Sequence, residues 1–290
     1  MKNFYICIVM LSCLFTGYSA SAQTYTNNPI SQYYRHGYLW NGAYAGASKK
    51  PVLYGLANRS WIGFDGAPTL ITFAGDFGFS TRSGAGLVVS SNKAGALQRV
   101  SARFNYSYRI DFNETQKLRL GVGLNTYRER LNNEVLGNDG AIDPAVRAFN
   151  EKGVYLDGEF GAVYESKQFT FAGSLLNIRR AVQKESIRPS DLPIFQLMSS
   201  YSFAVEEDIN LKPLVSFKHF INQKDLFAGG LQLEYEKTFH ASLLYQNTGS
   251  LQGMLGVTVK DMGEVNVGYG SNNKDGYGQQ WEVGVLFKLK

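Results

Sequence analysis

Short segments with one apolar and one polar face repeat along the chain from about Pro51 to the C-terminus. Between Val100 and Ile110 every second residue is apolar, and the residues between them are serine, asparagine or arginine. A period of two residues is typical of β-strands that have one face in an apolar medium and the other in water. Strands buried on both faces, as in parallel sheets, would be apolar at every position. We therefore predict an all-β, antiparallel protein.

About fourteen such segments can be counted, and an even number is typical of bacterial single-chain membrane barrels. We expect them to begin near Val52, Thr69, Gly84, Leu97, Lys117, Gly153, Gln168, Pro193, Ile209, Asp225, Thr238, Leu251, Gly263 and Gln279. Soluble β-sandwiches and lipocalin-like barrels also alternate, with the apolar face inward. Fourteen strands would be unusual for either of them, so the count favours a membrane barrel.

The connections between these segments also alternate in length. Every second connection is tight, at 80–83, 113–116, 165–167, 206–208, 237 and 261–262, and two of the others are long, at 131–152 and 180–192. Outer-membrane barrels have short periplasmic turns and long external loops. We therefore predict a transmembrane β-barrel of about 14 strands with both termini in the periplasm.

Aromatic residues occur near the ends of several predicted strands, where a membrane barrel carries an interfacial girdle. These residues are Tyr54, Trp61, Tyr127, Tyr201, Tyr245 and Trp281. Their positions support the membrane assignment.

The first residues have the pattern of a secretory signal peptide. Lys2 precedes an apolar run from Phe4 to Phe15, and small residues follow up to Ala22. We predict that residues 1–22 are removed, together with both cysteines. The alternative is a lipoprotein that keeps Cys13 as its lipid-modified first residue.

The remaining chain divides into an N-terminal segment, residues 23–50, and a barrel, residues 51–290. A fourteen-strand barrel leaves a channel unless something fills it. Charges of both signs fall on the polar faces of the strands, at Arg103, Arg109, Arg119, Asp157, Glu159, Glu234, Glu236, Glu264, Glu282 and Lys288. We predict that part of the periplasmic segment 23–50, which is rich in aromatic residues and glycine, folds into the lumen as a plug or seals its mouth.

Few residues indicate chemistry. The three histidines, His36, His219 and His240, are scattered and lack a metal-ligand or catalytic spacing. Three acidic residues of the first long loop could hold calcium but lack the spacing of a dedicated site, namely Glu134, Asp139 and Asp143. The net charge of +5 is not clustered, so we expect no nucleic-acid partner. We predict no catalytic residues, no metal and no cofactor; a membrane-embedded hydrolase is the alternative from the enzyme class.

Several motifs resemble those of one family. They are Asn28-Pro29-Ile30-Ser31-Gln32-Tyr33-Tyr34, then Trp40-Asn41-Gly42-Ala43-Tyr44-Ala45-Gly46, then Arg59-Ser60-Trp61-Ile62-Gly63-Phe64-Asp65-Gly66-Ala67-Pro68-Thr69, and finally Asp76. Together they are similar to the PorP/SprF family of outer-membrane proteins of the type IX secretion system. The resemblance implies a non-enzymatic barrel in the outer membrane.

On this resemblance, the barrel would dock, anchor or help export a secreted cargo protein, such as an adhesin or another type IX substrate. A periplasmic lipoprotein of the secretion or gliding-motility machinery and the outer-membrane lipid would be its other partners. The residues implied to be structural or partner-binding are Tyr44, Gly46, Arg59, Trp61 and Asp76. We expect Arg59 to pair with an inward Asp76 and clamp the first hairpin. A passive or substrate-specific outer-membrane channel is the alternative function.

Overall fold

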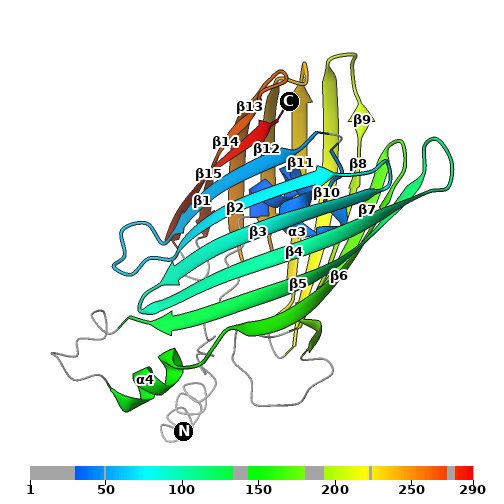
Figure 1. Cartoon of the computed structure of the whole chain (residues 1–290). Coiled ribbons are helices and arrows are strands. Elements are labelled where there is room, and N and C mark those ends of the chain that lie inside the picture. The colour runs from blue at the N-terminus through cyan, green and yellow to red at the C-terminus, as the bar shows by residue number, and fades with distance from the viewer. Residues whose placement is uncertain are drawn as a thin grey trace, which may run out of the picture.

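A computed structural model describes residues 30–48, 50–132, 143–179, 193–221, 224–272 and 278–289. The predicted signal peptide and the loop 180–192 lie outside these residues. The described chain forms a β-barrel with short helical segments inside it and one helix, α4 (Pro144–Asn150), beyond one end of the wall (Figure 1). No helix among the described residues is both long enough and apolar enough to cross a bilayer.

Antiparallel strands make up the wall. They are β1 (Val52–Ser60), β2 (Thr69–Gly78), β3 (Ser83–Ala94), β4 (Leu97–Asp111), β5 (Lys117–Leu131), β6 (Tyr155–Glu165), β7 (Phe169–Leu176), β8 (Ile194–Tyr201), β9 (Phe203–Ala204), β10 (Ile209–Phe220), β11 (Leu226–Tyr235), β12 (Phe239–Gln246), β13 (Ser250–Val259), β14 (Gly263–Asn272) and β15 (Gly278–Lys288). Each begins within two residues of the predicted start, apart from β9, which was not predicted as a separate strand.

The sheet closes on itself because β1 pairs with β15, from Val52 opposite Lys288 to Ser60 opposite Gln280. The two-residue strand β9 pairs with β10 alone and continues β8 past Ser202, so β8 and β9 together form one stave of the barrel. The wall is therefore a closed barrel of 14 antiparallel strands, which confirms the predicted fold.

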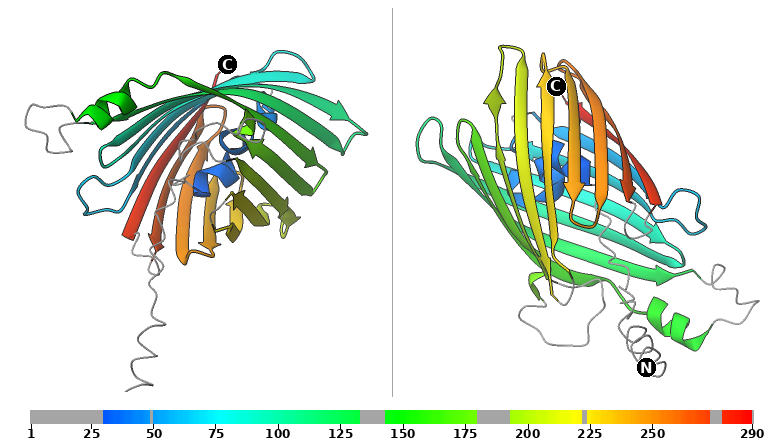
Figure 2. Two further views of the ribbon diagram at one scale, coloured as in Figure 1. Left: turned by 90° about the horizontal axis from the view of Figure 1, so that it is seen from below. Right: turned by 180° about the vertical axis from the view of Figure 1, so that it is seen from behind.

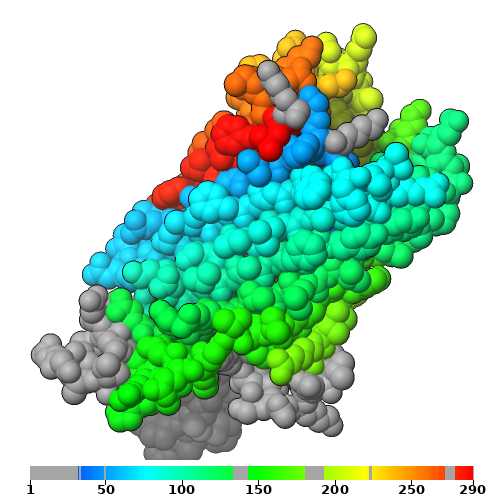
Figure 3. All heavy atoms as spheres, viewed as in Figure 1, coloured from blue at the N-terminus to red at the C-terminus, as the bar shows by residue number. Residues whose placement is uncertain are grey.

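The apolar faces of the strands point away from the barrel axis. Phe104, Val267 and Phe287 are 54%, 56% and 57% exposed, whereas the charged side chains of Arg119 and Glu264 are buried inside. The space-filling view shows this outer wall as a continuous surface over β1 to β6 (Figure 3). A soluble barrel would place these side chains the other way round, so the structure supports a lipid-facing exterior.

The predicted aromatic girdle is correct for three of its strand residues. Tyr201, Tyr245 and Trp281 lie on the outward face of their strands. The prediction is wrong for Tyr54 and Tyr127, because they share the inward face of their strands with buried residues. Both rings contact lumenal residues and are not available to lipid.

Both ends of the described wall lie at the end of the barrel that carries the tight turns. The backbone N–H of Leu289 donates to the carbonyl oxygen of Pro51, which ties the last strand to the start of the first. The connection between β5 and β6, with α4, lies at the opposite end (Figure 1). Which end faces the periplasm stays a prediction.

Candidate functional site in the barrel lumen

Residues 30–48, which we call the lumenal segment, lie inside the barrel (Figure 2). The segment consists of α2 (Ile30–Arg35), α3 (Gly37–Trp40) and the 3₁₀ turn η1 (Gly42–Tyr44). Asn41 separates the last two because its backbone is extended and its side chain accepts a hydrogen bond from the N–H of Ala43. Asparagine is favoured at such caps. The short pieces let the chain follow the curved inner wall.

Asn41 also attaches the segment to the wall. Its side-chain Nδ2 donates to the carbonyl oxygen of Gly173 at 2.8 Å, and the residue is fully buried. One residue earlier, the carbonyl oxygen of Trp40 accepts a hydrogen bond of 2.9 Å from Gln196 Nε2. These polar contacts give the segment a defined position against β7 and β8, since a buried amide left without partners would be costly.

Apolar side chains of the segment pack on inward-facing apolar residues of the wall. One cluster joins Tyr34, Trp40 and Ala43 to Val163, Ala172, Met198, Leu214 and Leu244. A second joins Tyr38, Leu39 and Ala45 to Leu56, Ala74 and Val88. Tyr44 packs against both clusters. Burial of this kind stabilises a docked segment by roughly 25 cal/mol for each Å² of apolar surface removed from water.

A buried ion-pair network joins α2 to β11 and β14. Arg35 Nη1 lies 2.8 Å from Glu234 Oε2, and Arg35 Nη2 lies 2.8 Å from Glu264 Oε2. Burial disfavours the charged form of Arg35, but the hydrogen bonds and the charge of Glu264 outweigh it and raise the pKa of Arg35. The guanidinium is therefore a charged link between the lumenal segment and the wall.

Two histidines complete this network. His36 Nε2 lies 3.6 Å and His240 Nε2 lies 3.3 Å from Glu264 Oε1. Asn266 hydrogen-bonds to both rings and to Glu264. Burial lowers the pKa of His36 to about 4, against an opposing effect of the Glu264 charge. At neutral pH the His36 ring is therefore neutral.

A second charged contact lies on the opposite side of the segment. Arg103 Nη2 donates to the carbonyl oxygen of Tyr38 at 2.9 Å and to that of Leu39 at 3.2 Å. The same guanidinium lies over the Tyr38 ring, 5.8 Å from its centroid. Asn105 and Glu159, which hydrogen-bond to each other, lie beside it on β4 and β6. Arg103 and Glu264 thus hold the segment from two sides of the lumen.

Two of the five residues implied by the resemblance, Gly46 and Asp76, are in direct contact. The N–H of Gly46 donates to Asp76 Oδ2 at 3.0 Å. Gly46 has a φ of +65°, and a Cβ there would lie 2.6 Å from the Cα of Gly84. Tyr44 lies two residues away in the same turn of chain. A glycine is required here because the lumenal segment crosses the wall backbone without space for a side chain.

Arg59 and Trp61 lie elsewhere, and the expected clamp between Arg59 and Asp76 is wrong. In the pairing of β1 with β2, Arg59 is opposite Thr69 whereas Asp76 is opposite Val52. Seven residues along a strand correspond to roughly 23 Å. Arg59 also faces outward, whereas Asp76 faces the lumen. Trp61 lies just beyond the strand, in the connection to β2, and has a positive φ of 56°.

The remaining candidates for chemistry have structural roles. His219 Nδ1 lies 2.7 Å from Asp225 Oδ1 on the exposed rim. Asp143 accepts a hydrogen bond from the N–H of Ala145 and caps α4, while Glu134 and Asp139 lie outside the described residues. Within the described part of the chain, no three histidine, cysteine, aspartate or glutamate side chains are grouped to hold a metal ion.

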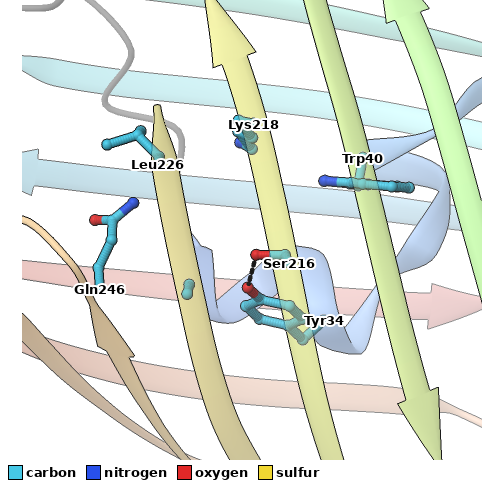
Figure 4. Close-up of a pocket in the computed structure, with 7 residues that line it drawn as sticks. Tyr34, Trp40, Ser216, Lys218, Leu226 and Gln246 are labelled. Atoms are coloured by element: carbon cyan, nitrogen blue, oxygen red, sulfur yellow. Dashed lines mark hydrogen bonds between the residues drawn. The ribbon is translucent and has the colours of Figure 1, made fainter. Parts of the chain in front are cut away.

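Tyr34 lines two cavities in the lumen. The first is narrow and is lined by Tyr34, Trp40, Ser216, Lys218, Leu226, Ala228 and Gln246 (Figure 4). The second is larger. It is lined in part by the turn residues Ser166, Lys167 and Gln168, and therefore opens toward the tight-turn end. The Tyr34 hydroxyl and Ser216 Oγ, which both line the first cavity, form a hydrogen bond of 2.7 Å.

Sequence reasoning did not identify Arg35 and Asn41 as residues that hold the segment, and it placed Glu264 on a polar strand face without its partner Arg35. Arg35 is a cation in a segment that is otherwise aromatic and glycine-rich. That contrast was a usable signal, because an isolated charge among apolar residues needs a partner when it is buried. The identity of the partner depends on strand register, which the residue pattern does not specify.

Comparisons with known proteins agree with this architecture. The chain resembles the Acinetobacter baumannii outer membrane protein Omp33, with 8% identity, a TM-score of 0.51, and coverage of 84% of this chain and 100% of the other. It also resembles the CymD monoaromatic hydrocarbon channel, with 11% identity, a TM-score of 0.50, and coverage of 87% and 92%. At these identities the likeness concerns the fold. No curated protein sequence is similar enough to count as a match.

A sequence profile described as type IX secretion system membrane protein PorP/SprF matches residues 22–276. The match spans the lumenal segment and nearly all of the barrel. A closed barrel with an apolar exterior and a profile of a secretion-system membrane protein together place the molecule in the outer membrane. The chain belongs to the PorP/SprF family of type IX secretion system membrane proteins.

Proposed function

We propose that this barrel docks a secreted cargo protein at its long-loop end and contacts periplasmic secretion machinery at its tight-turn end, without catalysing a reaction. The family assignment supports a role in type IX secretion, because the family is one of secretion-system membrane proteins. The proposed orientation follows from short turns at one end and long connections at the other.

The attachment of the lumenal segment inside the barrel is the observation that supports this proposal over a channel. The lumenal segment lies between opposite parts of the wall and is held by the Arg35–Glu264 ion pair, by Asn41 and by two apolar clusters. A pore built for free diffusion has no need for such attachments. A docking protein benefits from them, because they make the barrel rigid and keep it sealed while it holds a partner.

Site-specific photocrosslinking tests the proposal. A photoreactive amino acid replaces Arg147, which is exposed on α4 at the long-loop end, or Lys237, which is exposed in the tight turn after β11. We expect a secreted protein to crosslink at position 147 and a periplasmic protein at position 237. If position 147 forms no crosslink to a secreted protein in cells that still export their type IX substrates, the docking role is contradicted.

A channel remains the second candidate, since the two cavities that Tyr34 lines lie against the same part of the wall, β10 and β11. Liposome swelling separates the two functions. Permeation of small solutes through the wild-type barrel would favour the channel, and impermeable liposomes that still bind cargo would favour docking.

A further inference from the structure

A row of basic side chains crosses the outer face of the first five strands at the long-loop end. Strand register places one residue of each strand side by side in the order Arg59, Thr69, Lys93, Gln98 and Arg130. Arg128 lies two residues from Arg130 on the same face of β5. We call Arg59, Lys93, Arg128 and Arg130 the basic row; all four are exposed.

The basic row lies at the edge of the apolar band. Along β5 the outward residues Val122 and Leu124 are exposed to more than half, and Arg128 follows two outward positions later. Along β3, exposed Val89 precedes Lys93 by the same interval. Adjacent strands are about 4.8 Å apart, so cations two strands apart are separated by about 10 Å.

An aromatic girdle continues the row on its other side. Trp281 pairs with Arg59, and Tyr269 pairs with Trp281, all on the outer face. Tryptophan and tyrosine prefer the boundary between acyl chains and headgroups. Because Trp281 and Tyr269 lie in the same row as Arg59, we expect Arg59 to lie at the height of the lipid headgroups.

The charges in this row have few opposing groups. No ion pair joins a described residue to Arg59, Lys93, Arg128 or Arg130, whereas Arg99 pairs with Glu129 on the lumenal side. The outward residues between them are neutral, and the connection from β1 to β2 adds one carboxylate, Asp65. Among the described outward residues of this row and the connection from β1 to β2, four cations and one carboxylate give a net charge of +3.

We propose that the basic row binds the phosphate groups of anionic lipid headgroups. The acyl chains that cover Leu124 and Val89 belong to lipids whose headgroups must lie beside the row. Arginine presents a planar fork that matches phosphate oxygens, and three of the four residues are arginine. This inference rests on the barrel spanning a membrane and is independent of its cargo. In the proposed orientation the row lies in the outer leaflet.

Lipid retention by the purified barrel tests the proposal. The barrel is reconstituted in phosphatidylcholine nanodiscs that contain a minority of phosphatidylglycerol, released into detergent, and its bound lipids are counted by native mass spectrometry. We expect phosphatidylglycerol to be enriched over its bulk share. Arg128→Gln/Arg130→Gln should lower this enrichment by about fivefold for each cation removed, the equivalent of about 1 kcal/mol per charge.

The matched control removes two exposed lysines from tight turns at the other end, Lys237→Gln/Lys260→Gln. All four positions are exposed, so the variants should fold equally well. An equal loss of enrichment in the control pair would overturn the proposal, because it would reflect net charge alone. Inorganic phosphate should displace no more lipid than sodium chloride of the same ionic strength. Selective displacement by inorganic phosphate would assign the row to free phosphate instead of lipid.

Discussion

Arg35 should contribute more than any exposed charge to keeping the lumenal segment in place. Its Nε and Nη2 donate to Glu264 at 2.8 to 3.0 Å, and its Nη1 donates to Glu234 at 2.8 Å. The variant Arg35→Met keeps the length and apolar stem of the side chain but leaves Glu264, 7% exposed, without its main counter-charge. Removing one partner of a buried ion pair costs about 3–5 kcal/mol.

Hydrogen exchange measures this cost directly, because local opening of the segment exposes its backbone amides. In the docked segment the N–H groups of Leu39, Asn41 and Ala45 donate to carbonyl oxygens of the segment itself. A loss of 3–5 kcal/mol should accelerate their exchange by roughly 150-fold to 5,000-fold, since 1.4 kcal/mol is a factor of ten. Arg59→Met, on the outer face, should leave these amides unchanged and serves as the matched control.

A double-mutant cycle separates the ion pair from other effects of the substitution. Glu264→Gln should also accelerate exchange, because it leaves the Arg35 charge with Glu234 alone. The double variant Arg35→Met/Glu264→Gln should be less destabilised than the sum of the two single variants, by about 0.5–3 kcal/mol. Additive effects, or single variants that exchange at the wild-type rate, would refute the view that this pair holds the segment.

Three further outcomes are expected. Gly46→Ala should release the lumenal segment and accelerate its amide exchange, because a Cβ would meet the backbone of β3, whereas Gly153→Ala, with nothing within 4 Å, should have little effect. Tyr34→Ala should raise single-channel conductance in planar bilayers by joining the two cavities, and an unchanged conductance would mean that they do not lie on one path. Docking of the segment should weaken as the pH falls from 6.5 toward 4, because the pKa of His36 is about 4 when docked and 6.5 when free, so that only the free form takes up a proton in this range. The loss should approach about 3 kcal/mol at pH 4, and pepsin digestion of His36→Gln should show a flatter pH profile.

The fold could be predicted from the sequence because lipid and water impose opposite demands on alternate residues. The contrast is strong in β4 and β14, where the outward residues are large and apolar and the inward ones are polar or small. Closure of the barrel could be predicted because, in a membrane, the backbone groups of an open strand edge would have no hydrogen-bond partners. Both arguments need only the local pattern and the number of strands.

The alternation is less clear in β1 and β2, so it did not show that Arg59 and Asp76 lie on opposite faces of the wall. Their inward residues Leu56 and Ala74 are apolar because they pack on the lumenal segment. The inward face of each strand then mixes apolar residues with polar ones such as Asn58 and Asp76, so the contrast between the two faces is weaker than in β4. The register of the hairpin also depends on where its eight-residue connection, 61–68, begins and ends, so the separation of Arg59 from Asp76 could not be read from their spacing.

Glycines on the inner wall leave space for the lumenal segment. A Cβ at Gly121 of β5 would lie 2.5 Å from the backbone of Ala43, and Gly161 of β6 faces the side chain of Asn41 in the same way. A wide pore has no reason to keep its wall bare of side chains at these points. The lumenal segment and the wall therefore fit as a single packed unit, in which expelling the segment would expose Trp40 and Tyr38 and break the Arg35–Glu264 pair. A function that requires no opening of the lumen, such as holding a partner protein at the rims, is the one that this packing favours.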